Sequence, residues 1–163
     1  MDDKKSILNK IIPVAVLKAL TQEAEHAIPL TMSVEGFVSI RQFPFRVGRE
    51  SRVQTVKGKI ERIERPKHES NEPNNDLYLV DRGQLLNISR EHFLIEKEGD
   101  RYLLSDRGSA CGTKINDQSV GGNDAGGTHI LRDGDEIVIG TKDSPYRFQF
   151  IDLQNSIETI LCA

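Results

Sequence analysis

Residues 89–116 read SREHFLIEKEGDRYLLSDRGSACGTKIN and carry the clearest structural signal in this chain of 163 residues. Two β-rich runs, His92–Lys97 and Arg101–Ser105, flank the turn-forming tripeptide at 98–100. Because successive side chains of a strand point to opposite faces of the sheet, the two runs predict a hairpin with one face directed to a core. The side chains expected on that face are Phe93, Ile95, Tyr102 and Leu104.

Similar short runs lie on both sides of this hairpin and predict further strands. They are Val34–Val47, Leu77–Val80, Lys114–Ile115, Glu136–Gly140 and Tyr146–Ile151. Many short strands separated by polar turns are typical of an all-β sandwich, so this is the fold class that we expect.

The two ends of the chain and one internal segment depart from this strand pattern. Apolar residues recur every three or four positions over residues 4–27, which predicts a helical N-terminal extension within 1–29, with Pro13 in its first turn if the helix begins there. Residues 50–75 are charged and rich in turn formers, which predicts an exposed insertion in a domain that spans 30–152. Residues 153–163 form a tail in which one or two helical turns are expected.

The composition of the chain indicates which classes of partner and which cellular compartment to expect. The net charge of −3 argues against nucleic acid as the main partner, because duplex binding usually needs a strongly basic face. Two cysteines make no disulfide framework, which favours a reducing compartment, and we expect a cytoplasmic protein. The longest apolar run, residues 11–17, is far shorter than the ~20 residues that span a bilayer, so no membrane span is expected.

Four short signals follow one another in a fixed order along the predicted strands. They are Gly48-Arg49, Ser89-Arg90-Glu91-His92, the segment 109–116 and the segment 131–140. An arginine fork, a serine hydroxyl and a turn rich in small residues are groups that can hold a phosphate when loops bring them together. These signals therefore predict a phosphate-binding site on loops that join the strands.

Taken together, these signals resemble the signature of the forkhead-associated (FHA) domain, over about Val34 to Asp152. The resemblance implies a β-sandwich of about eleven strands that binds phosphothreonine peptides through loops at one end. It also implies a signalling adaptor, with a phosphothreonine-containing protein as partner and a serine/threonine kinase acting upstream.

The resemblance assigns roles to individual residues. Arg49 and Ser89 match the family's phosphate contacts, and Arg90 can add a backbone N–H and a second positive charge. His92 matches a histidine that stabilises the serine loop. Gly48 is expected to let the backbone turn tightly, so that the arginine can face the ligand.

The third loop departs from the family pattern. Ala110 stands where a hydroxyl residue is frequent, and Cys111 replaces an asparagine whose amide can bind the peptide backbone. Both positions are expected at the peptide-binding surface, with Lys114 as a further charged candidate. The side chains expected to shape the loop are Gly112, Thr113 and Asn116.

Two alternatives to phosphopeptide recognition stay open. The substitutions at 110 and 111 are compatible with an interaction module of the same fold that has lost its phosphate dependence. Ser89 and His92, three residues apart, could also be a nucleophile and its base in a hydrolase, but no third group that would orient the histidine is identifiable. We therefore predict that the protein is not an enzyme. The scattered histidines and cysteines and the lack of a nucleotide-binding motif predict neither a metal nor a cofactor.

Overall fold

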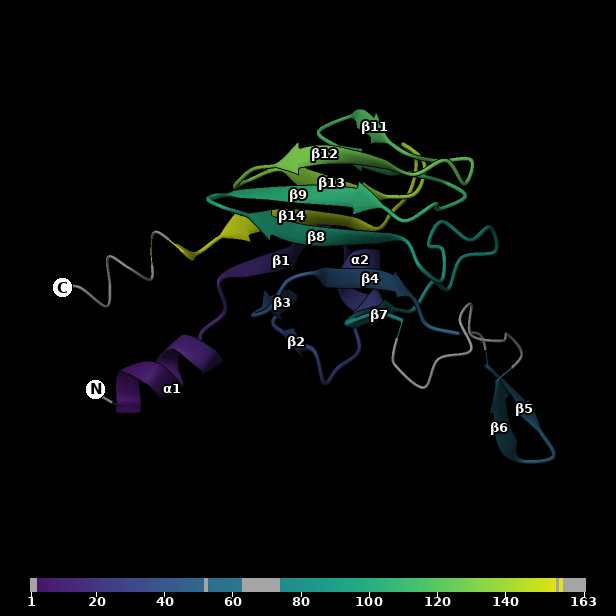
Figure 1. The fold of residues 1–163 in the computed structure, drawn as a ribbon. Coiled ribbons are helices and arrows are strands. Elements are labelled where there is room, and N and C mark those ends of the chain that lie inside the picture. Colours follow the sequence, from purple (N-terminus) through teal and green to yellow (C-terminus); the bar gives the residue numbers. More distant parts are fainter. Residues whose placement is uncertain (1–2, 52, 63–73, 155, 157–163) are drawn as a thin grey trace.

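The computed structural model describes residues 3–51, 53–62, 74–154 and 156. Two sheets form a sandwich (Figure 1). The seven-stranded sheet contains β1 (Ala15–Ala19), β2 (Ser33–Val34), β3 (Phe37–Ile40), β10 (Thr113–Ile115), β11 (Gln118–Val120), β13 (Glu136–Ile139) and β14 (Arg147–Asp152). The five-stranded sheet contains β4 (Phe45–Arg49), β7 (Leu77–Leu79), β8 (Phe93–Glu98), β9 (Arg101–Asp106) and β12 (Gly127–Leu131). The predicted all-β sandwich is confirmed.

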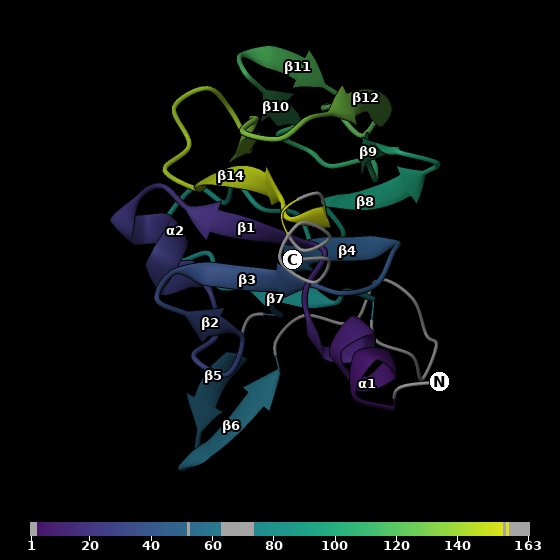
Figure 2. The same cartoon turned by 90° about the vertical axis from the view of Figure 1, so that its left-hand side faces the viewer.

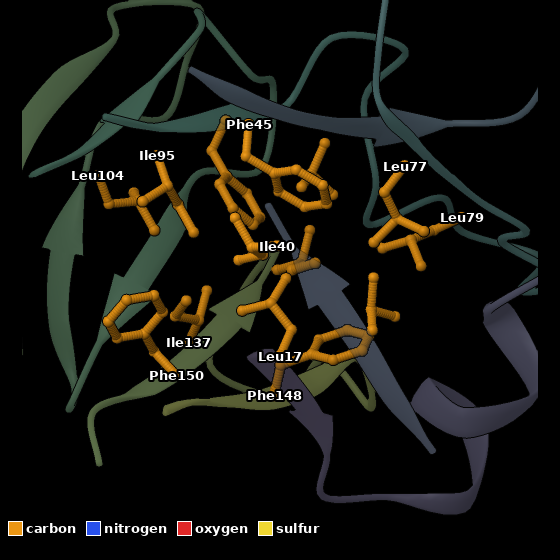
Figure 3. Packing of buried hydrophobic residues seen from close by; sticks show 14 of the residues in the cluster. Leu17, Ile40, Phe45, Leu77, Leu79, Ile95, Leu104, Ile137, Phe148 and Phe150 are labelled. Carbon is orange, nitrogen blue, oxygen red and sulfur yellow. The ribbon is translucent and has the colours of Figure 1, made fainter. Parts of the chain in front are cut away.

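The core lies between the two sheets and consists almost entirely of apolar side chains. Figure 3 shows Leu17, Phe148 and Phe150 of the seven-stranded sheet opposite Phe45 and Ile95 of the five-stranded sheet. All four inward residues predicted for the β8–β9 hairpin are buried. The two-residue period of strand side chains therefore predicts correctly which residues of this hairpin are directed to the core.

The predicted single helix over residues 4–27 is wrong. The structure has α1 (Asp3–Ile11), then strand β1, then α2 (Gln22–Ala27). Strand β1 pairs with β14 on one side and β3 on the other, so part of the predicted extension is an inner strand of the sandwich. Short apolar runs of this kind cannot be assigned to helix or strand from periodicity alone, and here pairing with the distant β14 decides the outcome.

Helix α1 does form at the N-terminus, and it lies apart from the sandwich in both views (Figure 2). None of its side chains is buried. In the described part of the chain, no helix combines the length and the apolar character needed to cross a membrane.

Part of the predicted exposed insertion is ordered secondary structure. Strands β5 (Val53–Val56) and β6 (Lys59–Arg62) pair in a separate hairpin that projects from the sandwich (Figures 1 and 2). The sequence analysis expected an exposed insertion here and did not predict that two strands form within it. The predictions for 63–73 and for most of the C-terminal tail lie outside the described residues.

Candidate phosphate-binding cleft

Strand directions place the candidate site at one end of the five-stranded sheet. Strand β8 lies between β4 and β9 and is antiparallel to both, while β7 is parallel to β4. The carboxyl ends of β4, β7 and β9 therefore meet the amino end of β8 at the same edge (Figure 1). The loops that carry the sequence signals leave the sheet at this edge, so segments 40 to 60 residues apart in sequence become neighbours.

Gly48 is required by a close approach between two segments. A Cβ atom at this position would lie 2.1 Å from the backbone oxygen of Arg90 and 2.6 Å from Nδ2 of Asn75. Gly48 lies inside strand β4 and is not among the glycines with positive φ. The expected reason for this glycine, a tight turn, is therefore wrong: the missing side chain lets β4 pack against the Arg90 segment.

Arg49 is held at the end of β4 by backbone groups of the serine loop. Its backbone N–H donates to the oxygen of Ser89 at 2.9 Å, and its Nε donates to the oxygen of Ile88 at 2.9 Å. The residue is only 8% exposed. These contacts fix the direction of the guanidinium, which reduces the conformational entropy that a ligand would have to remove on binding.

The serine loop and the third loop are joined through Ser89 and His92. Oγ of Ser89 accepts the backbone N–H of Ala110 at 3.1 Å. Nδ1 of His92 accepts the backbone N–H of Ser89 at 2.9 Å, and Nε2 lies 2.7 Å from the oxygen of Gly112. This pattern requires the neutral tautomer with a proton on Nε2. Both ring nitrogens bond to backbone groups, so the ring is not positioned as a base for the Ser89 hydroxyl.

Acidification is expected to destabilise the fold through His92. Burial lowers the pKa of this histidine from its ordinary value of 6.5, while the Gly112 carbonyl and the Asp106 carboxylate oppose the shift. Above pH 6.5 the ring is neutral in both the folded and the unfolded chain and adds no pH dependence. As the pH falls from 6.5 towards the folded pKa, the unfolded chain takes up the proton first. Stability then falls by up to about 1.4 kcal/mol per pH unit.

Urea unfolding between pH 7.5 and 5, with NMR of the His92 ring in parallel, measures this effect. The ring is expected to keep the neutral Nε2–H form while the protein stays folded below pH 6. An imidazolium at pH 6 in the fully folded protein would contradict the assigned hydrogen bonds.

The third loop is organised by Asp106, which the sequence analysis did not select. One carboxylate oxygen accepts the backbone N–H groups of Gly108 and Ser109 at 3.0 and 2.8 Å. The other accepts the hydroxyls of Ser109 at 2.6 Å and Thr113 at 2.8 Å. An aspartate that accepts N–H groups two and three residues ahead forms an Asx-type turn. The position of Asp106 at a strand end, before Arg107-Gly108, could therefore have indicated this turn from the sequence.

An ion pair between the half-buried Arg107 and the buried Glu91 stabilises the same edge, and the sequence analysis did not select it. Nη2 of Arg107 lies 3.5 Å from Glu91, and Nη1 donates to the side chain of Asn75 at 2.6 Å. Asn75 in turn donates to the oxygen of Arg90 at 2.7 Å. Burial lowers the pKa of Arg107, and the Glu91 carboxylate opposes that shift. Removing either charge would leave the other buried, which is costly, so this pair holds the Arg90 segment in place.

These loops enclose a cleft of about 380 Å³. Four of the six predicted ligand-side residues line it, namely Arg49, Ser89, Arg90 and Ala110. Four further lining residues were not predicted, namely Leu86, Ile88, Gly108 and Asp124. The described residues that line the cleft thus include two arginines, one serine and one aspartate. The arginines and the serine are residue types suited to an anionic ligand.

The two other predicted ligand-side residues do not line this cleft. The thiol of Cys111 lies 3.4 Å from the oxygen of Leu86, which makes it a link between two loops. Nζ of Lys114 bonds to Oγ of Ser119 at 2.8 Å, across the β10–β11 pair. The structure therefore separates both residues from the cleft, although Cys111 contacts a residue that lines it.

The residues expected to shape the third loop all have defined places in it. Gly112 has φ +84°, a conformation that residues with a Cβ rarely adopt, and its oxygen accepts bonds from His92 and from the N–H of Gly140. The hydroxyl of Thr113 is bonded to Asp106. Asn116 bonds to the side chain of Asp135 at 2.7 Å and accepts the N–H of Glu136 at 2.9 Å, away from the cleft.

The glycine-rich segment 121–127 is an ordered part of this end of the sandwich. Four of its seven residues are glycine, a composition typical of flexible loops. Instead, the N–H of Asn123 donates to the oxygen of Ala110 at 3.0 Å, and the N–H of Asp124 donates to the oxygen of Ser109 at 3.1 Å. These two bonds attach the segment to the third loop and bring Asp124 to the cleft.

A larger cleft, of about 460 Å³, lies elsewhere and has different chemistry. It is lined by Arg41, Phe43, Pro44, Arg46 and Asp76, among others. Arg46 pairs with Asp76 at 3.2 Å, and Nε of Arg41 donates to the backbone oxygen of Ile11. None of the described residues that line this cleft belongs to the four sequence signals, so the cleft at Arg49 is the candidate phosphate site.

Comparison with protein families identifies the fold family. A model of the FHA domain matches residues 45–140. This chain belongs to the FHA domain family. FHA domains are interaction modules rather than enzymes. A search of curated proteins found no match.

Several solved FHA structures resemble this FHA domain. The FHA domain of CT664 from Chlamydia trachomatis is 18% identical and has a TM-score of 0.50, over 85% of this chain and 96% of that one. An engineered FHA with Myc-pTBD peptide is also 18% identical, with a TM-score of 0.50 over 91% and 98% of the two chains. EmbR of Mycobacterium tuberculosis, in complex with a low affinity phosphopeptide, is 19% identical, with a TM-score of 0.49 over 93% and 32%.

Proposed function

We propose that this FHA domain recognises phosphothreonine peptides in the cleft at Arg49. The observation that carries the proposal is that Arg49, Ser89, Arg90 and Ala110, from three separate segments, line one cleft. A phosphothreonine brings a charge of about −1.5 to −2 and three acceptor oxygens at neutral pH. Guanidinium forks and a hydroxyl are donors that match such a group.

The proposed mechanism is binding without reaction. Arg49 and Arg90 supply positive charge, and the hydroxyl of Ser89 can donate its proton because its oxygen already accepts the N–H of Ala110. Hydrolysis through Ser89 is disfavoured because both nitrogens of His92 bond to backbone groups. The proposal therefore describes an adaptor and not an enzyme.

A phosphothreonine partner implies further participants. The proposal includes a serine/threonine kinase that acts upstream on the partner, and a cytoplasmic location for the complex. The peptide is expected to lie over the loops at this end of the sandwich, where Leu85 is 87% exposed beside Leu86 of the cleft.

A competing proposal is an interaction module without phosphate dependence. Ala110 brings no hydroxyl to the cleft, and the thiol of Cys111 contacts the oxygen of Leu86. Each lost donor can weaken binding by about 0.5–1.5 kcal/mol. The remaining two guanidinium side chains and the Ser89 hydroxyl favour the phosphate-dependent reading.

Binding of the full-length chain to an oriented phosphothreonine peptide library, with the unphosphorylated library as control, tests the proposed function. We expect the phosphorylated library to bind at least about tenfold more tightly, because one charged hydrogen bond is worth about 1.5–3 kcal/mol. Equal retention of both libraries would instead support the phosphate-independent module.

A further inference from the structure

We propose that Asp124 makes this cleft selective for phosphothreonine peptides that carry a basic residue beside the phosphothreonine. This inference rests on the proposed function and assigns a specificity to the same site. Asp124 lines the cleft together with Arg49, Ser89 and Arg90. It is the one acidic residue among the eight that line it.

The position of Asp124 is fixed by the backbone. Its φ is 62°, and its N–H donates to the oxygen of Ser109 at 3.1 Å. The preceding residue, Asn123, donates its N–H to the oxygen of Ala110 at 3.0 Å. These bonds hold the backbone of residue 124 at a fixed position beside the third loop. Because its side chain is short, the carboxylate cannot move far from the cleft.

The carboxylate of Asp124 is available to a ligand. The residue is exposed, and within the described ranges no side chain or backbone donor forms a hydrogen bond or ion pair with it. This distinguishes it from Asp106, whose two oxygens accept four bonds inside the loop. Asp124 thus contributes charge to the cleft without a role in holding the loop together through its side chain.

A carboxylate in a phosphate-binding cleft is unfavourable unless the ligand compensates for it. Repulsion between this charge and a dianion bound in the same cleft is not fully screened by salt, because the Debye length is about 8 Å at physiological ionic strength. A lysine or arginine next to the phosphothreonine would convert this repulsion into attraction. In a peptide that carries both groups, the phosphate therefore matches Arg49 and Arg90, and the basic side chain matches Asp124.

Asparagine is the matched replacement at this position. It has nearly the same shape, it lacks the charge, and it adopts positive φ more readily than most residues do. Asp117→Asn is the control, because Asp117 is also exposed and has φ 71°, but it lies in the β10–β11 turn and does not line the cleft. The two variants change the net charge equally, so any difference between them reports the position of the charge.

Anisotropy titrations of the full-length chain with defined phosphothreonine peptides test the inference. Each peptide carries arginine, glutamine or glutamate at one position within three residues of the phosphothreonine. At one or more positions, the arginine peptide is expected to bind about three- to fivefold more tightly than the glutamine peptide, the upper part of the range for an exposed ion pair. Asp124→Asn should remove this preference and strengthen binding of the glutamine peptide, whereas Asp117→Asn should retain the preference.

Two different failures are distinguishable. If phosphorylated peptides bind more tightly than unphosphorylated ones but arginine, glutamine and glutamate peptides bind equally, the selectivity is rejected and the phosphate site stands. The same conclusion follows if Asp124→Asn and Asp117→Asn keep identical preferences. If phosphorylation does not strengthen binding in any peptide, the proposed function fails, and this inference fails with it.

Discussion

Replacing Arg49 by alanine is expected to weaken phosphothreonine-peptide binding by roughly 10- to 100-fold, because it removes charge-assisted hydrogen bonds worth about 1.5–3 kcal/mol. The Nε of this residue is already oriented by the oxygen of Ile88, so the wild-type side chain needs little reordering when it binds. Titration of one phosphorylated peptide against both proteins gives the ratio directly. Binding of the unphosphorylated peptide should change little.

Loss of the Ile88 contact could also disturb the loop, and two further variants separate these effects. Arg49→Gln keeps an amide donor for the Ile88 oxygen but has no charge, and it is expected to lose phosphopeptide affinity as Arg49→Ala does. Arg46→Ala removes an arginine from the same strand whose side chain pairs with Asp76 outside the cleft, and it should leave binding unchanged. A folded Arg49→Gln variant with full affinity would reject the phosphate-binding role of Arg49.

Replacing Gly48 by alanine is expected to lower the free energy of unfolding by about 3 kcal/mol, the upper range for inserting a methyl group into a packed region. The new Cβ would lie 2.1 Å from the backbone oxygen of Arg90, and a backbone atom cannot move aside as a flexible side chain can. The melting temperature should fall by about 10 °C in a domain of this size. Phosphopeptide binding should weaken as well, because the clash displaces Arg90 relative to Arg49.

Gly99→Ala in the β8–β9 turn provides the comparison for this prediction. Nothing lies within 4 Å of a Cβ atom at that position, although φ is 61°. This variant is expected to cost only about 1–2 kcal/mol, from the strain of a left-handed conformation. Equal costs for the two variants, measured by urea unfolding, would show that the approach of β4 to the Arg90 segment is not as tight as the structure indicates.

The sandwich was predictable because its signals are local. In β8 and β9, a short apolar run beside a turn-forming tripeptide indicates the strands, and the two-residue period of strand side chains indicates their inner face. The Asn116–Asp117 turn also follows local rules, since Ile115 pairs with Gln118 across two residues with φ of 46° and 71°. Strand β1 was not predictable in this way, because one of its two partners, β14, lies 129 to 137 positions later in the chain.

The candidate cleft was predictable only in part. Arg49, Ser89, Arg90 and Ala110 were selected from a family pattern and do line one cleft, while their role in binding phosphate stays a prediction. Lys114 was selected for its position just after Thr113, but it lies on a strand and bonds to Ser119. Proximity in sequence to a loop residue does not predict that a side chain reaches the cleft, because at the edge of a sheet the chain passes from loop to strand within one or two residues.

The amino-acid sequence alone specified the strand pattern, the turns and the types of side chain that could hold a phosphate. These properties depend on residues at most a few positions apart, through periodicity, turn chemistry and functional groups. The packed structure established which of those residues share a cleft, and it placed Asp124 there with two arginines and a serine. It also brought β4 so close to the Arg90 segment that Gly48 must lack a side chain. Such relations are distances between atoms of remote segments, and they exist only after the two sheets have packed and the strand order has brought the loops together.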